Sequence, residues 1–172
     1  MSIAFLPERY LYAFISHLIR DYENPIFNFL LAHIPNKYLN KPKIKELLSS
    51  DKRIFKENFV EINSRLIIIN LEDEFIDISK SGIESIDEIK NIYFHRDRII
   101  SINASNNNIS NLATFSIFPN LEDIFLNNND ISSLEGLESI PSLKYISLMG
   151  NKLKKIKVLE NLNVDIAFDD YE

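Results

Sequence analysis

The stretch LEDIFLNNNDISSLEGLESIPS, residues 121–142, is followed at once by LKYISLMGNKLKKIKVLENL, residues 143–162, and both follow one pattern. The pattern recurs in weaker form 22 residues earlier, from Ile99. Its apolar positions are Ile99, Ile102, Ala104, Ile109, Leu112, Phe115 and Phe118; then Leu121, Ile124, Leu126, Ile131, Leu134, Leu137 and Ile140; then Leu143, Ile146, Leu148, Leu153, Ile156 and Leu159. A fixed period of this size predicts stacked supersecondary units, because one unit alone cannot bury its apolar face.

Asparagines recur with the same period as the apolar positions. Asn107, Asn129 and Asn151 lie 22 residues apart, each shortly after the alternating apolar pair of its repeat. An asparagine amide both donates and accepts hydrogen bonds, and the residue tolerates turn conformations. The three residues are therefore expected to form a structural ladder that satisfies the backbone groups of buried turns.

Each repeat contains a short strand and a tight return. Ile124 and Leu126 alternate with polar residues, which places both side chains on one side of a strand. The next apolar residues recur at every third position, which suits a 3₁₀-like return on the outer face. Parallel stacking of such units predicts a sheet with an open, concave inner surface.

The motif L-x-x-L-x-L-x-x-N-x-L resembles a leucine-rich repeat. The 22-residue spacing, with Pro119 and Pro141 two positions before the next repeat, is similar to the short class found in phosphatase-regulatory and spliceosomal scaffold proteins. The resemblance covers residues 73–170 and implies an α/β fold, a short leucine-rich-repeat solenoid with about four or five parallel strands. It leaves the function open, because such scaffolds serve many partners.

The residues before the repeats predict an N-terminal helical cap. Pro7 and Glu8 suit the start of a helix over residues 7–22, and a second helix is expected from Pro25 to the residue before Pro35. Two further helices are expected around residues 44–48 and 54–62. The predicted domains are a helical cap, residues 1–65, and the solenoid, residues 66–172.

Weaker repeats flank the regular ones. The runs LIIIN, residues 66–70, and FIDIS, residues 75–79, predict two strands, or one strand leading into the first repeat strand. That first repeat is enlarged to 26 residues by the insertion NIYFHRDR, residues 91–98. Ser85–Glu88 and Ser132–Glu135 both fit a helix capping box. Ile166 and Phe168 predict one last strand.

Composition excludes several kinds of site. The chain has no cysteine, which rules out disulfides and cysteine-based metal sites. Three glycines cannot build a phosphate-binding loop, and no cofactor or metal is expected. No basic segment precedes an apolar N-terminal run, and no apolar run approaches the length of a membrane span, so we expect a cytoplasmic protein without a membrane partner.

A catalytic function is the less favoured interpretation of the sequence. The histidines, at positions 17, 33 and 95, lie far apart, and none has the spacing of a metal motif. His17 and Asp21 are one helical turn apart and could touch, but this spacing arises often by chance. We therefore expect no catalytic residue, and the alternative is a catalytic cleft in the helical cap that uses His17 or His33.

Charge is divided unevenly along the chain. Residues 1–70 contain ten Lys and Arg against seven Asp and Glu, whereas residues 71–172 contain nine against eighteen. The net charges of +3 and −9 predict that the repeats repel nucleic acid and attract a basic protein. A simpler alternative is that the acidic excess only keeps the protein soluble.

The side chains that alternate with the buried pairs define a predicted surface, which we call the sheet face. It combines aromatic, amide and carboxylate groups, as a protein-binding hot spot does. The expected partner-binding residues are Phe75, Asp77, Asn103, Asp123, Phe125, Asn127, Tyr145, Ser147, Met149, Asp165 and Asp169.

Two kinds of binder fit this surface. One is an inhibitor, such as an immunity protein that neutralises a basic toxin or nuclease, for which steered charges would give fast and tight binding. The other is an adaptor that holds a multiprotein complex together, as the resemblance to phosphatase-regulatory and spliceosomal scaffolds implies. Size and charge favour the inhibitor slightly.

Overall fold

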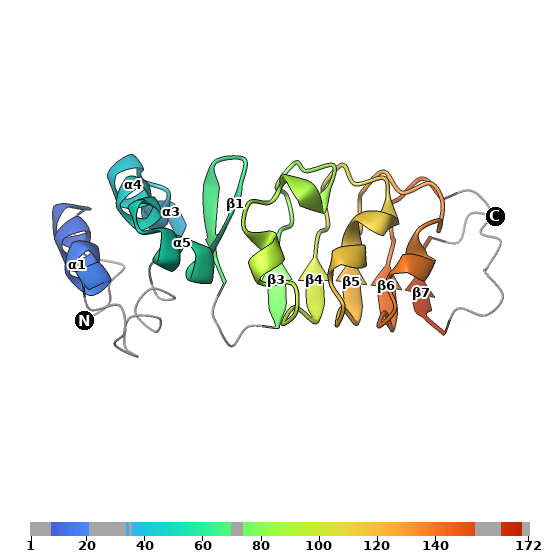
Figure 1. The fold of residues 1–172 in the computed structure, drawn as a ribbon. Helices are drawn as coiled ribbons and strands as arrows, with labels where there is room; N and C mark the ends of the chain where they lie inside the picture. Colours follow the sequence, from blue (N-terminus) through green and yellow to red (C-terminus); the bar gives the residue numbers. More distant parts are fainter. Residues whose placement is uncertain (1–7, 21–33, 35, 70–73, 154–162, 170–172) are drawn as a thin grey trace. The chain divides into compact units, whose positions relative to one another are not determined.

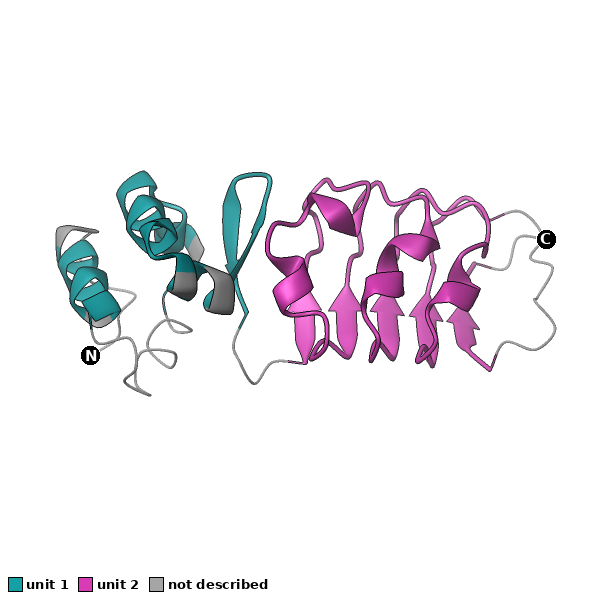
Figure 2. Ribbon diagram, viewed as in Figure 1, with its two compact units in different colours: residues 1–72 teal, residues 73–172 magenta. Residues whose placement is uncertain are grey.

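The computed structural model describes residues 8–20, 34, 36–69, 74–153 and 163–169. The chain divides into two compact units, residues 1–72 and 73–172 (Figure 2). The expected domain boundary after residue 65 falls inside a strand of the first unit. The helix expected between residues 25 and 34 lies outside the described ranges, except for its last residue.

A five-stranded parallel sheet forms one side of the second unit (Figure 1). Its strands follow one another in chain order and are β3 (Phe75–Asp77), β4 (Ser101–Asn103), β5 (Asp123–Phe125), β6 (Tyr145–Ser147) and β7 (Asp165–Ala167). The central isoleucines Ile76, Ile102, Ile124, Ile146 and Ile166 are paired in register across the sheet. The predicted α/β leucine-rich-repeat solenoid is confirmed.

The repeated apolar positions form the core of this unit. All of those that fall in the described ranges are buried, including Ile102, Ile124 and Ile146, which are fully enclosed. The same holds for Ile76 and Ile78 in the degenerate first repeat. Ile156 and Leu159 lie outside the described residues. The 22-residue period therefore marks the side chains that neighbouring repeats bury between them.

Short 3₁₀ helices form the return segments, as the three-residue spacing predicted. They are η2 (Ile86–Glu88), η3 (Ile92–Phe94), η4 (Leu112–Ile117) and η5 (Leu137–Ser139). The predicted capping box of Ser85 and Glu88 is present, because the Ser85 Oγ accepts from the Asp87 amide and the Glu88 carboxylate accepts from the Ser85 amide.

The second capping box, at Ser132 and Glu135, was predicted wrongly. Helix η5 begins after Gly136 and has no side-chain cap. Gly136 has a φ of 92°, and a Cβ there would lie 2.7 Å from the backbone nitrogen of Ala113. A glycine that permits close contact between repeats replaces the expected cap.

The asparagines connect each repeat to the one before it. The Asn129 side chain donates to the carbonyls of Leu126 in its own repeat and Ala104 in the preceding one, each at 3.0 Å. Its Oδ1 accepts from the Ile109 amide, also at 3.0 Å. Asn151 repeats this arrangement one unit later, with Leu126 shared as an acceptor. The result is a continuous ladder of buried hydrogen bonds between repeats.

The ladder ends on the first repeat, which has Ser81 where the others have asparagine. There the Asn107 side chain donates to the carbonyls of Ile78 and Ala104 and accepts from the amides of Ser81 and Ile83. The side-chain amide of Asn107 thus supplies hydrogen-bond partners for the backbone of a turn that contains no asparagine of its own.

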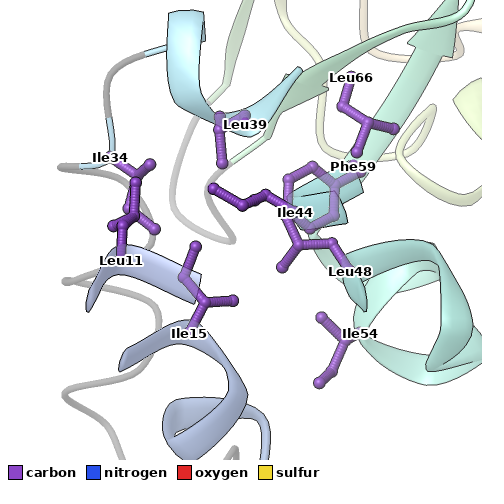
Figure 3. Packing of buried hydrophobic residues seen from close by; sticks show 9 residues of the cluster. All are labelled: Leu11, Ile15, Ile34, Leu39, Ile44, Leu48, Ile54, Phe59 and Leu66. Atoms are coloured by element: carbon purple, nitrogen blue, oxygen red, sulfur yellow. The ribbon is translucent and has the colours of Figure 1, made fainter. Parts of the chain in front are cut away.

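The first unit is built from helices followed by a hairpin. Its elements are α1 (Glu8–Arg20), α3 (Asn36–Leu39), α4 (Pro42–Ser50), α5 (Lys52–Asn58), β1 (Phe59–Ile62) and β2 (Arg65–Ile68). Figure 3 shows their shared core, in which Leu11 and Ile15 of α1 meet Ile44 and Leu48 of α4. Ile34, Leu39, Ile54, Phe59 and Leu66 complete the cluster.

The hairpin corrects one sequence prediction and decides between the two alternatives of another. The expected fourth helix ends at Asn58, so that Phe59 and Ile62 belong to a strand. Of the two alternatives for residues 66–79, two separate strands are observed: the run that begins at Leu66 lies in β2, which pairs antiparallel with β1, and β3 belongs to the parallel sheet. Two left-handed residues, Asn63 and Ser64, close the hairpin and match the twist of paired strands.

Replacing Asn107 with alanine is expected to lower the free energy of unfolding of the second unit by about 3 kcal/mol, because buried backbone groups lose their partners. Chemical denaturation of the purified protein measures this change. Asn108→Ala is the matched control: the neighbouring side chain is exposed and should alter stability by less than about 0.5 kcal/mol. Equal effects of the two changes would contradict the structural role of the ladder.

Candidate functional site: the sheet face

The sheet face consists of three rows of side chains that cross the five strands. Strand pairing places Phe75, Ser101, Asp123, Tyr145 and Asp165 in one row and Asp77, Asn103, Phe125, Ser147 and Ala167 in the next. The third row follows the strands and contains Ser79, Ser105, Asn127, Met149 and Asp169. These positions alternate with the buried isoleucines, which fixes the side of the sheet to which they belong.

An aromatic pair lies at the centre of the sheet face. The rings of Phe125 on β5 and Tyr145 on β6 have centroids 5.7 Å apart and are tilted by 54°. This arrangement is one that aromatic rings favour. Each ring is partly buried, although both side chains point outward from the sheet as predicted, because the rings cover one another. Phe75 and Met149, by contrast, are 49% and 42% exposed.

Carboxylates surround the aromatic pair. The sheet face contains Asp77, Asp123, Asp165 and Asp169 and no lysine, arginine or histidine. Among the described residues, neither Asp123 nor Asp165 makes an ion pair. Asp77 accepts a hydrogen bond from the Ser79 amide within its own turn. The face is therefore negatively charged, with two acidic groups that no described internal cation neutralises.

The polar residues of the sheet face mainly hold its own backbone. Asn103 accepts from the amide of Ser105, and the Asn127 Oδ1 accepts from the amide of Met149. The same oxygen also accepts a hydrogen bond from the Ser147 hydroxyl at 2.6 Å. Ser147 is only 4% exposed, which differs from its expected role as a contact residue. A partner would meet the aromatic and acidic side chains first.

The histidines do not form a second site in the described part of the chain. His17 is exposed at the end of α1, while His33 and Asp21 lie outside the described residues. His95 is buried, and its Nδ1 lies 2.8 Å from the Arg98 guanidinium. No group of three potential metal ligands converges among the residues described, and no helix there is long and apolar enough to cross a membrane.

An open groove of about 470 Å³ lies where β5 and β6 begin. Glu122 and Lys144 both line it and form an ion pair with each other at 2.7 Å. Leu137, Pro141 and Val164 contribute apolar surface. Glu138 also lines the groove, so that a net charge of −1 remains after Glu122 and Lys144 are paired.

Sequence reasoning missed one exposed aromatic pair. Tyr93 and Phe94 of η3 are 50% and 57% exposed and lie in the insertion of the first repeat. The hydrogen bond that the Tyr93 hydroxyl donates to Asp87 raises the pKa of Tyr93. The extra length of this repeat was the signal that its return segment differs from the others.

The comparison with known families agrees with the geometry. Residues 119–161 match the family model for leucine-rich repeats, in two copies. This segment therefore contains two leucine-rich repeats. Such repeats typically form non-catalytic modules for protein–protein interaction. No curated protein matches the chain.

The outward direction of Phe125 and Tyr145 can be tested by stability. Phe125→Ala and Tyr145→Ala should each lower the free energy of unfolding by only about 1 kcal/mol, because both rings stay partly in solvent. Ile124→Ala removes a fully buried side chain on the opposite side of the same strand as Phe125 and should cost about 2–5 kcal/mol. Thermal unfolding monitored by circular dichroism compares the three. A larger loss for Phe125→Ala than for Ile124→Ala would contradict the observed strand register.

Proposed function

We propose that this protein is a non-catalytic binding module whose sheet face holds a basic protein partner. The observation behind this proposal is that an aromatic centre, Phe125 and Tyr145, lies beside two carboxylates, Asp123 and Asp165, that make no ion pair among the described residues. A partner would bury the aromatic rings and bring positive charges to the surrounding aspartates. Together these contacts combine apolar burial with charge selectivity.

The charge of the whole repeat unit supports a basic partner. Residues 73–172 contain seventeen Asp and Glu against nine Lys and Arg, a net charge of −8. Lys144 and Lys152 are paired with Glu122 and Asp130, so these two lysines do not offset the carboxylates of the sheet face. A field of this sign accelerates association with positively charged proteins and disfavours nucleic acid.

The finer version of the proposal is an inhibitor that neutralises a basic toxin such as a nuclease. Fast association matters most for such a role, and the acidic unit favours it through electrostatic steering. The adaptor in a multiprotein complex is the second candidate, and the leucine-rich repeats themselves favour it, because they serve as interaction modules in many assemblies.

Replacing both Phe125 and Tyr145 with alanine should weaken partner binding by about 2–4 kcal/mol, which is the range of hot-spot residues. The immobilised protein is used to capture proteins from a lysate of its source cells, and the affinity of each captured protein is then measured by titration. Phe94→Ala is the matched control, since it removes an exposed ring from the return side.

The captured protein also distinguishes the candidates. A single basic protein whose nuclease or other toxic activity is blocked by the wild type, but not by the double variant, would support the inhibitor. Capture of a multi-subunit assembly with unchanged activity would support the adaptor. Binding that the double variant retains at full strength would show that another surface holds the partner and would contradict the proposal.

A further inference from the structure

We infer that the sheet face recognises an arginine side chain of its partner at a subsite formed by Asp123, Phe125, Tyr145 and Asp165. This inference rests on the proposed function and names the chemical group that the face selects. It follows from the order of side chains in one row of the sheet, where an aromatic ring lies between two carboxylates.

Strand pairing sets the geometry of the subsite. Tyr145 is paired directly with Asp123 on β5 and with Asp165 on β7. Neighbouring strands lie about 4.8 Å apart, so the two aspartates flank the ring and are about 10 Å from each other at the backbone. A cation that packs against the Tyr145 ring is therefore within the field of both carboxylates.

The shape of the group favours arginine over lysine. A guanidinium is planar and packs flat on an aromatic ring, while its N–H groups point outward in its own plane. It can thus stack on Tyr145 and still donate hydrogen bonds to a flanking carboxylate. An ammonium group is compact and more strongly hydrated, and it cannot offer the same forked contact.

Phe125 completes the subsite with an apolar wall. Its ring lies diagonally next to that of Tyr145, with a centroid separation of 5.7 Å, and both rings retain solvent-exposed surface. The methylene groups of an arginine stem can cover this surface while the charged end reaches the aspartates. Asp123 and Asp165 have no competing ion pair among the described residues, so an incoming guanidinium displaces none of the cations that the structure describes.

Hexa-arginine and hexa-lysine peptides with blocked ends test the inference on the full chain. They carry equal charge, so that isothermal titration at one ionic strength separates arginine recognition from charge alone. We expect hexa-arginine to bind about tenfold more tightly than hexa-lysine, a preference that lies between the energies of an exposed and a desolvated cation–π contact. Tyr145→Leu keeps the apolar bulk but should reduce this ratio to about threefold or less.

Asp123→Asn and Asp165→Asn should each weaken hexa-arginine binding by about three- to tenfold. Glu135→Gln is the matched control, because it removes one exposed charge outside the sheet face and should change affinity by less than about twofold. The ring resonances of Phe125 and Tyr145 should shift on titration with N-acetyl-arginine amide and shift less with the lysine analogue.

The outcomes separate the inference from the proposed function. Equal affinity for both peptides, lowered alike by Asp123→Asn and Asp165→Asn, would overturn the arginine subsite but leave an acidic binding face. Absence of binding, or binding that no sheet-face substitution alters, would contradict both the arginine subsite and the proposed function. Sedimentation should show a monomer. A dimer that these two substitutions dissociate would mean that a second copy occupies the face, and would also overturn the inference.

Discussion

The hydrogen bonds between each asparagine side chain and the backbone of the preceding repeat are the constraint on which the second unit depends. Each strand is only three residues long, so strand pairing alone offers few hydrogen bonds between neighbouring units. The turns after the strands also bury amides and carbonyls that water cannot reach, and such groups are costly when they are left without a partner. Asn107, Asn129 and Asn151 satisfy these groups and join the repeats at the same time.

This constraint also sets the direction of the side chains on the sheet face. Because a strand alternates its side chains, a shift of one residue would move Phe125 and Tyr145 into the core and expose isoleucines. The ladder fixes the turn after each strand, and the buried isoleucines fix the strand itself. Asp123, Tyr145 and Asp165 are therefore held in one row on adjacent strands, and their arrangement needs no contact among their own side chains. The side chains that we propose to bind the partner and the buried isoleucines therefore lie on opposite sides of the sheet.

The repeat unit could be predicted from the sequence largely because the residue types and the 22-residue period both indicate the same stacked strands and turns. Ile124 and Leu126 mark a strand, Asn129 marks the turn, and their recurrence marks the stack. The spacing of apolar residues was a less reliable guide where contacts with a distant segment decide between helix and strand. Phe59 and Ile62 continue a helical spacing from Phe55, yet they form a strand because Leu66 and its neighbours supply a partner strand.

The sheet face was predictable in its residues but not in the detail of their exposure. Alternation identifies which side chains share a side of the sheet, since it depends only on strand geometry. It does not show that Ser147 is covered, because that depends on the size of its neighbours and on its hydrogen bond to Asn127. Nor does it show that Phe125 and Tyr145 pack on each other, which requires the register between β5 and β6.

Native-state hydrogen exchange of the Ile109 and Ile131 amides tests most directly whether the asparagine ladder holds the repeats as one unit. These amides donate to the side chains of Asn129 and Asn151, whereas the amides of Ala104 and Leu126 donate to the carbonyls of neighbouring strands. The ladder predicts that all four exchange slowly and with the same free energy of opening. Exchange of Ile109 and Ile131 at the rate of exposed loop amides, while Ala104 and Leu126 remain protected, would contradict it.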